Sequence, residues 1–193
     1  MTGSTKGGIP LQEKYDDIET PVFILERLPV GDAVFCRLKC PDWINVIPLT
    51  RDGDVIFVRQ YRHGTDEETL EIPGGQMDPD DRDPLAAAVR ELREETGYGK
   101  GEWTTLGWVH PNPAILTNRC HLFLAEGVEE VGEICNDAHE HTIVERFPLQ
   151  DVPELVLSGR ITHGLVINAF SALALTRPGL FPWRINSETP VKE

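Results

Sequence analysis

Three glutamates within five residues, Glu91, Glu94 and Glu95, are the part of the sequence best suited to chemistry. On a helix, positions i, i+3 and i+4 share one face, so the three carboxylates would lie together. Carboxylates this close repel one another at neutral pH, so a cation must neutralise them or some must bind protons. Because Mg²⁺ prefers oxygen ligands of this kind, the spacing predicts a divalent-metal site. The alternative is an acidic helix face exposed to solvent.

The segment that carries these glutamates has the start and stop signals of a helix over residues 85–96. Asp83 can cap the first turn, and Pro84 suits the first helical position. Gly97 allows the left-handed conformation that commonly ends a helix. Arg90 is within reach of an ion pair with a glutamate one turn later. The apolar stripe expected to face the core consists of Leu85, Ala88, Val89 and Leu92.

Residues 75–98 resemble the Nudix box, Gly-x5-Glu-x7-Arg-Glu-U-x-Glu-Glu-x-Gly-U, in which U is apolar. The first half differs from the pattern, because one extra residue precedes Arg90. Counted back from Arg90, Arg82 therefore stands where the first Glu is expected. Asp81 and Asp83, on either side of it, are the candidates to replace that Glu. The second half matches at every fixed position: Arg90, Glu91, Leu92, Glu94, Glu95 and Gly97.

Two further runs, residues 58–62 and 70–75, resemble the ADP-ribose pyrophosphatase branch of this family, and the similarity covers residues 42–176. The resemblance implies an α/β fold, a Nudix-type α/β/α sandwich with a mixed sheet. Apolar patterning predicts elements that fit such a fold. The expected strands are 43–49, 55–61, 69–73, 104–109, 121–126 and 142–148, the first two of them neighbours, and the expected helices after the box are 152–157 and 162–175.

The chain begins with a polar tail and a predicted β-hairpin, formed by residues 22–28 and 33–39 around Pro29 and Gly31. This hairpin fits the small N-terminal sheet that the resembled branch often uses to form dimers, so the resemblance implies a homodimer. The predicted organisation is a tail and hairpin over 1–40, a Nudix hydrolase domain over 41–180 and a C-terminal tail over 181–193.

The resemblance implies hydrolysis of the diphosphate bond in a small nucleoside diphosphate derivative, with ADP-ribose or a related sugar as substrate. Water attacks one phosphorus while Mg²⁺ ions, for which Mn²⁺ could substitute, neutralise charge. By position in the box, Glu91 and Glu95 would be metal ligands, with Glu94 in support or shared. The backbone carbonyl of Gly74 would be a further ligand.

The general base is implied by the same resemblance to lie on a later loop. Glu140, shortly before the last predicted strand, suits that role. Glu94 and Glu91 are the next candidates, followed by His139 and His141. The alternative is a solvated polar loop without a role in the reaction.

Four residues are candidates for binding the substrate. Arg59 and Arg62 could bind the diphosphate through charge-assisted hydrogen bonds, but a spacing of three along a strand needs a bend to bring them to one face. Glu71 could pair with one of these arginines or touch a ribose. Trp43 could stack on a nucleobase, or could belong to the core or to a dimer interface.

Composition narrows the class of protein. With 18 Lys and Arg against 32 Asp and Glu the net charge is −14, which disfavours nucleic-acid binding. Residues 164–175 form the most apolar stretch and are too few to span a bilayer, and the first ten residues contain no signal-peptide pattern. We therefore expect a cytoplasmic protein that does not enter membranes. The four cysteines lack metal-site spacing and are expected to be reduced and mostly buried: Cys36, Cys40, Cys120 and Cys135.

Other functions are compatible with the sequence. The same chemistry could act on a nucleoside triphosphate or a dinucleoside polyphosphate. A non-catalytic Nudix regulator would bind a nucleotide without cleaving it, although such a protein would be expected to lack the helix glutamates. An acidic cation-binding protein is a further reading, but residues 78–83 lack the spacing of a calcium-binding loop.

Overall fold

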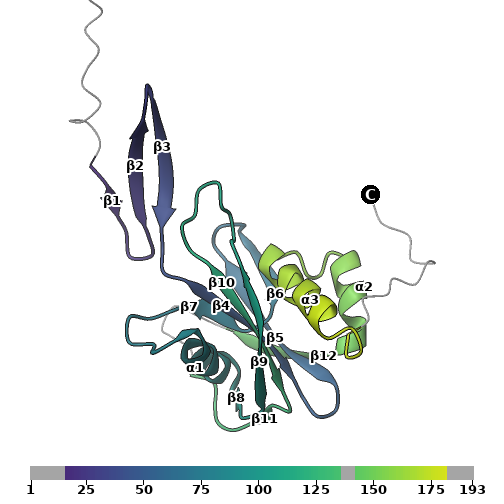
Figure 1. Cartoon of the computed structure of the whole chain (residues 1–193). Coiled ribbons are helices and arrows are strands. Elements are labelled where there is room, and N and C mark those ends of the chain that lie inside the picture. The colour runs from purple at the N-terminus through teal and green to yellow at the C-terminus, as the bar shows by residue number, and fades with distance from the viewer. Residues whose placement is uncertain (1–15, 136–141, 182–193) are drawn as a thin grey trace, which may run out of the picture.

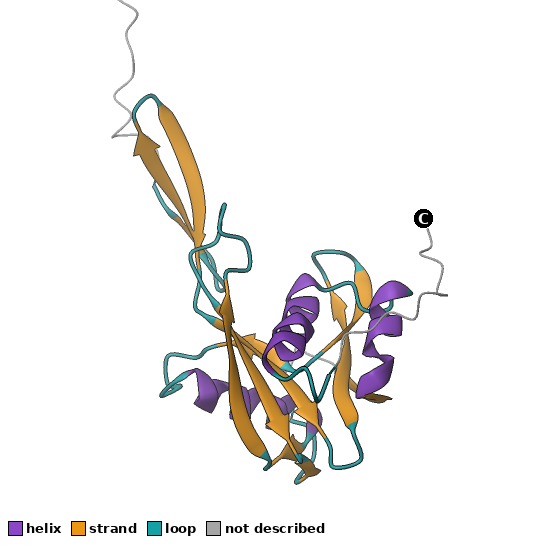
Figure 2. Ribbon diagram, turned by 45° about the vertical axis from the view of Figure 1, so that its right-hand side comes forward, coloured by secondary structure: helices purple, strands orange, loops and turns teal. Residues whose placement is uncertain are grey.

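The computed structural model describes residues 16–135 and 142–181, and its centre is a seven-stranded mixed sheet (Figure 1). The strands β12, β5, β4, β10 and β9 follow one another across it, spanning Ile143–Pro148, Asp54–Arg62, Trp43–Leu49, Cys120–Glu126 and Glu102–Val109. Helix α1 covers one face, and α2 and α3 cover the other (Figure 2). These helices span Pro84–Thr96, Val152–Leu157 and Gly164–Thr176. The arrangement confirms the expected α/β/α sandwich.

Two short strands lie where β4 and β5 separate. Strands β4 and β5 pair with each other as expected, but only next to their turn, where Leu49 lies opposite Val55. Further along, β6 (Glu67–Glu71) pairs with β5, and β7 (Gly74–Gln76) pairs with β4. The outer edges of β4 and β5 are taken by β10, which runs parallel to β4, and by β12. The gap between the diverging strands is therefore filled by β6 and β7, which carry the segment just before the Nudix-like box.

Helix α1 begins and ends at the residues that the sequence predicts. The carboxylate of Asp83 accepts a hydrogen bond from the backbone N–H of Ala86, and Pro84 is the first helical residue. Gly97 ends the helix with a φ of 73°, in the left-handed region that favours glycine.

The predicted apolar stripe of α1 is wrong in part, because Leu85 and Val89 are 38% and 43% exposed. The buried face is instead Ala87, Ala88, Leu92, Glu95 and Thr96. It packs against Ile44, Val46 and Ile56 of the sheet. The two alanines allow a close approach to the sheet, and the rotation that this requires brings Glu95 inward.

The opposite face of the sheet packs against α2, α3 and the 3₁₀ turn Leu149–Asp151. Phe57 of β5 stacks on Phe170 of α3, which also contacts Phe181. Phe181 is 2% exposed, so the last described residue lies in this core although the sequence assigned it to the C-terminal tail. The strands Tyr98–Gly99 (β8) and Glu129–Glu130 (β11) form a small separate ladder after α1.

The predicted N-terminal hairpin is confirmed, with one short strand added. β1 (Ile18–Glu19), β2 (Ile24–Val30) and β3 (Ala33–Lys39) form a three-stranded sheet that projects from the rest of the molecule (Figure 1). At its base, Leu38 exchanges backbone hydrogen bonds with Ile115 and Thr117, of 2.7 and 3.1 Å. About half of the surface of several of its apolar side chains is exposed: Ile18, Val22, Val30 and Phe35.

The cysteines are reduced, as expected, but the prediction that most are buried is wrong. Cys120 alone is buried, and desolvation raises the pKa of its thiol to about 12. Cys36 and Cys135 are exposed, and Cys40 is intermediate. Cys36 lies on the projecting sheet, and Cys40 and Cys135 lie on loops. In the described residues, no helix has the length and apolar character needed to cross a membrane.

Candidate active site

A cavity of about 790 Å³ lies beside the point where β4 and β5 diverge. Its walls come from β4 to β7, from α1 and from the start of α3. All of the predicted metal ligands line it: Gly74, Glu91, Glu94 and Glu95. Of the predicted substrate-binding residues, Trp43, Arg62 and Glu71 line it as well, and Arg59 does not. The structure therefore brings together most of the residues that the sequence singles out.

Strand β7 presents backbone, not side chains, to this cavity. A Cβ atom at Gly75 would overlap the carboxylate of Glu91. A Cβ atom at Gly74 would overlap the side-chain oxygen of Asn45 and the carbonyl oxygen of Ile44. Since neighbouring residues of a strand face opposite sides, Glu91 and Asn45 approach β7 from opposite faces. The paired glycines thus let polar groups come close to the backbone from both sides.

Glu91, Glu94 and Glu95 form what we call the carboxylate wall of the cavity. Glu95 is 3% exposed, and its Oε2 accepts a hydrogen bond of 3.0 Å from the backbone N–H of Gly74. This hydrogen bond holds the carboxylate of Glu95 next to Gly74, whose carbonyl is a predicted metal ligand.

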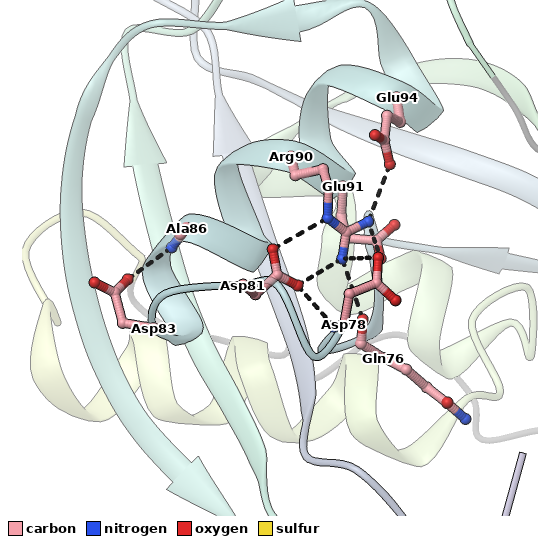
Figure 3. Close-up of polar contacts among 8 residues, drawn as sticks. All are labelled: Gln76, Asp78, Asp81, Asp83, Ala86, Arg90, Glu91 and Glu94. Carbon is pink, nitrogen blue, oxygen red and sulfur yellow. Dashed lines mark hydrogen bonds and ion pairs between the residues drawn. The ribbon is translucent and has the colours of Figure 1, made fainter.

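Arg90 holds the other two glutamates (Figure 3). Its Nη1 donates hydrogen bonds of 3.0 Å both to Oε1 of Glu91 and to Oε2 of Glu94. Its Nε and Nη2 donate to Asp81 at 3.2 and 2.9 Å, and Nη2 also reaches the carbonyl of Gln76 at 3.3 Å. The hydrogen bond to Asp81 raises the pKa of Arg90, and the same bond lowers the pKa of Asp81. A fixed cation therefore sits between the carboxylates of α1 and the loop before it.

The same contacts decide which aspartate replaces the first Glu of the box. Asp81 stands six residues after Gly75, as that Glu does in the pattern, and its carboxylate binds Arg90. Asp83 instead caps α1, and the N–H of Ala86 lowers the pKa of its carboxyl group. The extra residue therefore lies between Asp81 and Arg90, where the loop enters the helix.

The chemistry of the carboxylate wall fits a divalent cation. Three carboxylates and the backbone of Gly74 border one cavity, and oxygen atoms are the ligands that Mg²⁺ and Mn²⁺ prefer. Within the described part of the chain, however, no three acidic, histidine or cysteine side chains are already gathered into a metal site. In this arrangement Glu91 and Glu94 are bound to Arg90, and Glu95 is bound to the backbone N–H of Gly74.

Arg62 and Glu71 form a two-pronged ion pair on the cavity wall. Nε and Nη2 of Arg62 donate to the two oxygens of Glu71 at 2.7 and 2.6 Å, and Thr69 donates to the same carboxylate at 2.6 Å. Burial acts to raise the pKa of Glu71, but Arg62, Thr69 and His163 together outweigh it, so the net shift is downward. Glu71 is therefore ionised, and its oxygens are occupied by protein donors.

Arg59 lies on the other face of β5, because the bend that a shared face requires is absent. The pairing of β5 with β6 runs without a break from Val58 to Arg62, so residues three apart point to opposite sides. The guanidinium of Arg59 binds Glu145 at 2.8 Å and also pairs with Glu68. These carboxylates raise the pKa of Arg59, with the Glu145 hydrogen bond as the largest cause.

Glu140, His139 and His141 lie outside the described residues. The residues on either side of that segment are both bound to α1. The backbone N–H of Cys135 donates to the carbonyl of Glu94 at 2.8 Å, and Oγ1 of Thr142 donates to the carbonyl of Glu95 at 2.9 Å.

Several cavity residues were not anticipated from the sequence, among them Asn45 and His163. Together with Trp43 they form what we call the donor wall. Asn45 follows Trp43 by two residues on β4, so both share the face that packs against α3. His163 precedes α3, and its Nδ1 lies 3.4 Å from Oε2 of Glu71. Asn45 is a single polar residue in the otherwise apolar strand Trp43–Leu49, and this was the signal that could have drawn attention to it.

Comparison with known proteins agrees with this geometry. Residues 42–169 match the model of the NUDIX domain. The chain belongs to the Nudix family. Family membership also confirms the enzyme class expected from the sequence, a Nudix pyrophosphohydrolase.

Two curated Nudix relatives differ in the substrate for which they are named. An ADP-ribose pyrophosphatase of Bacillus subtilis is 31% identical over 77% of this chain and 81% of its own length. A CMP-5'-(N-acetyl-N-hydroxy-3-aminopropyl)phosphonate hydrolase of Streptomyces rubellomurinus is 33% identical over 77% of this chain and 72% of its own. The crystal structure of an ADP compounds hydrolase superposes with a TM-score of 0.72 at 22% identity, covering 84% of this chain and 90% of that one, and supports the fold.

Proposed function

We propose that this Nudix enzyme hydrolyses the diphosphate bond of ADP-ribose or a related nucleoside diphosphate sugar with Mg²⁺ as cofactor. The products would be a nucleoside monophosphate and a sugar phosphate. The observation that carries the proposal is the joint presence of the three α1 carboxylates, Gly74 and the Arg62–Glu71 pair around one cavity. The similarity to an ADP-ribose pyrophosphatase over 77% of the chain supports this choice of substrate.

Glu91, Glu95 and the carbonyl of Gly74 are proposed to hold Mg²⁺, with Glu94 shared or in support. When bound, the metal would neutralise phosphate charge and lower the pKa of bound water. Arg90 positions Glu91 and Glu94 through bonds of 3.0 Å and is itself fixed by Asp81. The side chain of Arg62 is 43% exposed, so it can donate to a phosphate oxygen while Glu71 holds its orientation.

Glu140 is proposed as the general base, with Glu94 as the alternative. The base takes a proton from water, the water oxygen bonds to one phosphorus, and the bond from that phosphorus to the bridging oxygen breaks. The anchoring of Cys135 and Thr142 to the carbonyls of Glu94 and Glu95 supports Glu140, because it ties the ends of that segment to α1.

We also propose that the enzyme is a homodimer in the cytoplasm, joined through the sheet β1–β3. This sheet exposes Ile18, Val22, Val30 and Phe35, and so small a sheet is marginally stable unless it packs on something else. Light scattering at micromolar concentration should give twice the mass of the chain. A monomer under these conditions would remove the proposal.

The function is tested by measuring AMP release from ADP-ribose at pH 7.5 to 9, with Mg²⁺, with Mn²⁺ and with a chelator. A panel of GDP-mannose, a CMP ester, a nucleoside triphosphate and a dinucleoside polyphosphate is assayed in parallel. Fast release that the chelator abolishes, with ADP-ribose preferred, is the expected result. Preference for another nucleotide would keep the reaction class and change the substrate, whereas a folded protein that cleaves none of them would contradict the proposal.

A further inference from the structure

Unpaired polar atoms are concentrated in the cavity. Among the described residues, four buried side-chain nitrogen or oxygen atoms have no hydrogen-bond partner. Three of them, Nε1 of Trp43, Nδ2 of Asn45 and Nδ1 of His163, belong to residues that line this one cavity. Asn45 is only 7% exposed. Because buried polar groups are nearly always paired in folded proteins, such a cluster indicates groups that a ligand pairs when it binds.

The donor wall and the carboxylate of Glu91 lie on opposite faces of the sheet, although Asn45 adjoins Gly74 itself. Asn45 approaches β7 at Gly74, on the face of the sheet that packs against α3, whereas Glu91 approaches at Gly75 from the α1 side. Residues from both sides nevertheless line the same cavity. One ligand can therefore contact both walls.

The chemistry of the donor wall suits an uncharged, hydroxylated group. Trp43 and Asn45 offer N–H donors, and neither is charged. Nδ1 of His163 lies 3.4 Å from Oε2 of Glu71 but makes no hydrogen bond to it, so this atom also remains for a ligand. A sugar hydroxyl both donates and accepts, so it can pair with the N–H groups and with the His163 ring. The ionised carboxylate of Glu71 faces the ring and disfavours a phosphate group there.

We propose that the donor wall, Trp43, Asn45 and His163, is the sugar-binding subsite of this enzyme, and that Asn45 is a specificity-determining residue within it. This inference rests on the proposed function and adds the part of the substrate that the wall recognises. The sugar belongs either to the nucleoside half or to the departing sugar phosphate. Both offer ring hydroxyls, and binding of the separate products distinguishes them.

The test is to measure binding of AMP and of ribose 5-phosphate by calorimetry in Mg²⁺ buffer, for the wild type and for Asn45→Ala. Losing one hydrogen bond to an uncharged ligand group should raise the dissociation constant of one product about tenfold. The same variant should melt at a temperature at least as high as the wild type, because it removes an amide that has no partner in the free protein. A merely structural asparagine would instead lower the melting temperature.

Asn118→Ala is the matched control. Asn118 is also a buried asparagine, 2% exposed and with one unpaired side-chain atom, but it does not line the cavity. Its Nδ2 donates to the carbonyl of Pro41 at 3.0 Å. Its substitution should therefore lower the melting temperature and leave both dissociation constants unchanged.

Each outcome decides the proposal separately from the proposed function. A tenfold loss for ribose 5-phosphate assigns the wall to the departing sugar, and a loss for AMP assigns it to the nucleoside; both support it. Unchanged affinities, or wild-type protein that binds neither product, would overturn it even if ADP-ribose is cleaved. Product binding that depends on Asn45 in a protein without hydrolytic activity would keep the subsite and reject the proposed function. If Asn45→Ala does not fold, His163→Gln, at a partly exposed position, is measured in its place. This variant is expected to weaken the binding of one of the two products.

Discussion

The two walls of the cavity differ in how far the protein itself satisfies their polar groups. On the carboxylate wall, Glu91 and Glu94 are held by Arg90, and Glu95 is held by the N–H of Gly74. On the donor wall, Trp43, Asn45 and His163 each keep a buried nitrogen without a hydrogen-bond partner. The carboxylates are therefore paired within the free protein, whereas three nitrogens of the donor wall are left for a ligand. The first arrangement favours a stable free enzyme, and the second favours selective binding.

The largest effect is expected at the carboxylate wall. Glu95→Gln keeps the shape of the side chain and removes the charge, so kcat should fall about a thousandfold or more with Mg²⁺ if this residue holds the metal. Glu130→Gln, at an exposed position of β11, is the control and should keep the wild-type rate. A Glu95→Gln variant with a rate near that of the wild type would show that the metal assignment is wrong.

A smaller effect separates the two arginines of β5. Arg62→Ala should raise KM for ADP-ribose roughly ten- to a hundredfold, because it removes a phosphate donor and leaves Glu71 without its main partner. Arg59→Ala should change KM by less than about twofold, since Arg59 points away from the cavity and pairs with Glu68 and Glu145. Equal effects of the two substitutions on KM would contradict the assignment of substrate binding to Arg62 and not to Arg59.

The support for the carboxylate wall can be tested with two aspartates of the same loop. Asp81→Asn should lower kcat about tenfold, because Arg90 loses its strongest partner and Glu91 and Glu94 lose a fixed neighbour. Asp83→Asn should leave kcat and the melting temperature almost unchanged, because asparagine caps a helix as well as aspartate does. A drop in kcat for Asp83→Asn alone would reverse the assignment of the first acidic residue of the box.

Local signals in the sequence predicted the elements that carry the carboxylate wall. Asp83, Pro84 and Gly97 specify where α1 begins and ends, and the spacing of its three glutamates specifies a shared face. These features depend on neighbours within a few residues, so they can be read without knowing the fold. The same local view misjudged Val89, because the rotation of α1 is set by contacts of Ala87 and Ala88 with distant strands.

The donor wall could not be predicted in this way, since its members are brought together by topology. Trp43 and Asn45 lie on β4, and His163 follows more than a hundred residues later, at the start of α3. Nothing near His163 in the sequence indicates that Glu71 will be its neighbour. The position of Arg59 depended on whether β5 bends, which its pairing with β6 decides. Sequence reasoning therefore found the wall built from one segment, but of the wall built from several segments it found only Trp43.

The smallest expected effect concerns the acid stability of the Arg62–Glu71 pair, which lies beside the donor wall. The pKa of Glu71 is lowered in the folded protein, so its contribution to the free energy of unfolding is present above its ordinary pKa of 4.5 and is lost as the pH falls below that value. Urea unfolding between pH 7 and pH 3 should therefore show a shallower loss of stability for Glu71→Gln than for the wild type. Asn45→Ala should keep the wild-type slope, because the donor wall contributes no carboxylate of its own. If Glu71→Gln follows the wild-type curve, the ion pair with Arg62 is too exposed to matter for stability, and its role is confined to orienting Arg62 for the substrate.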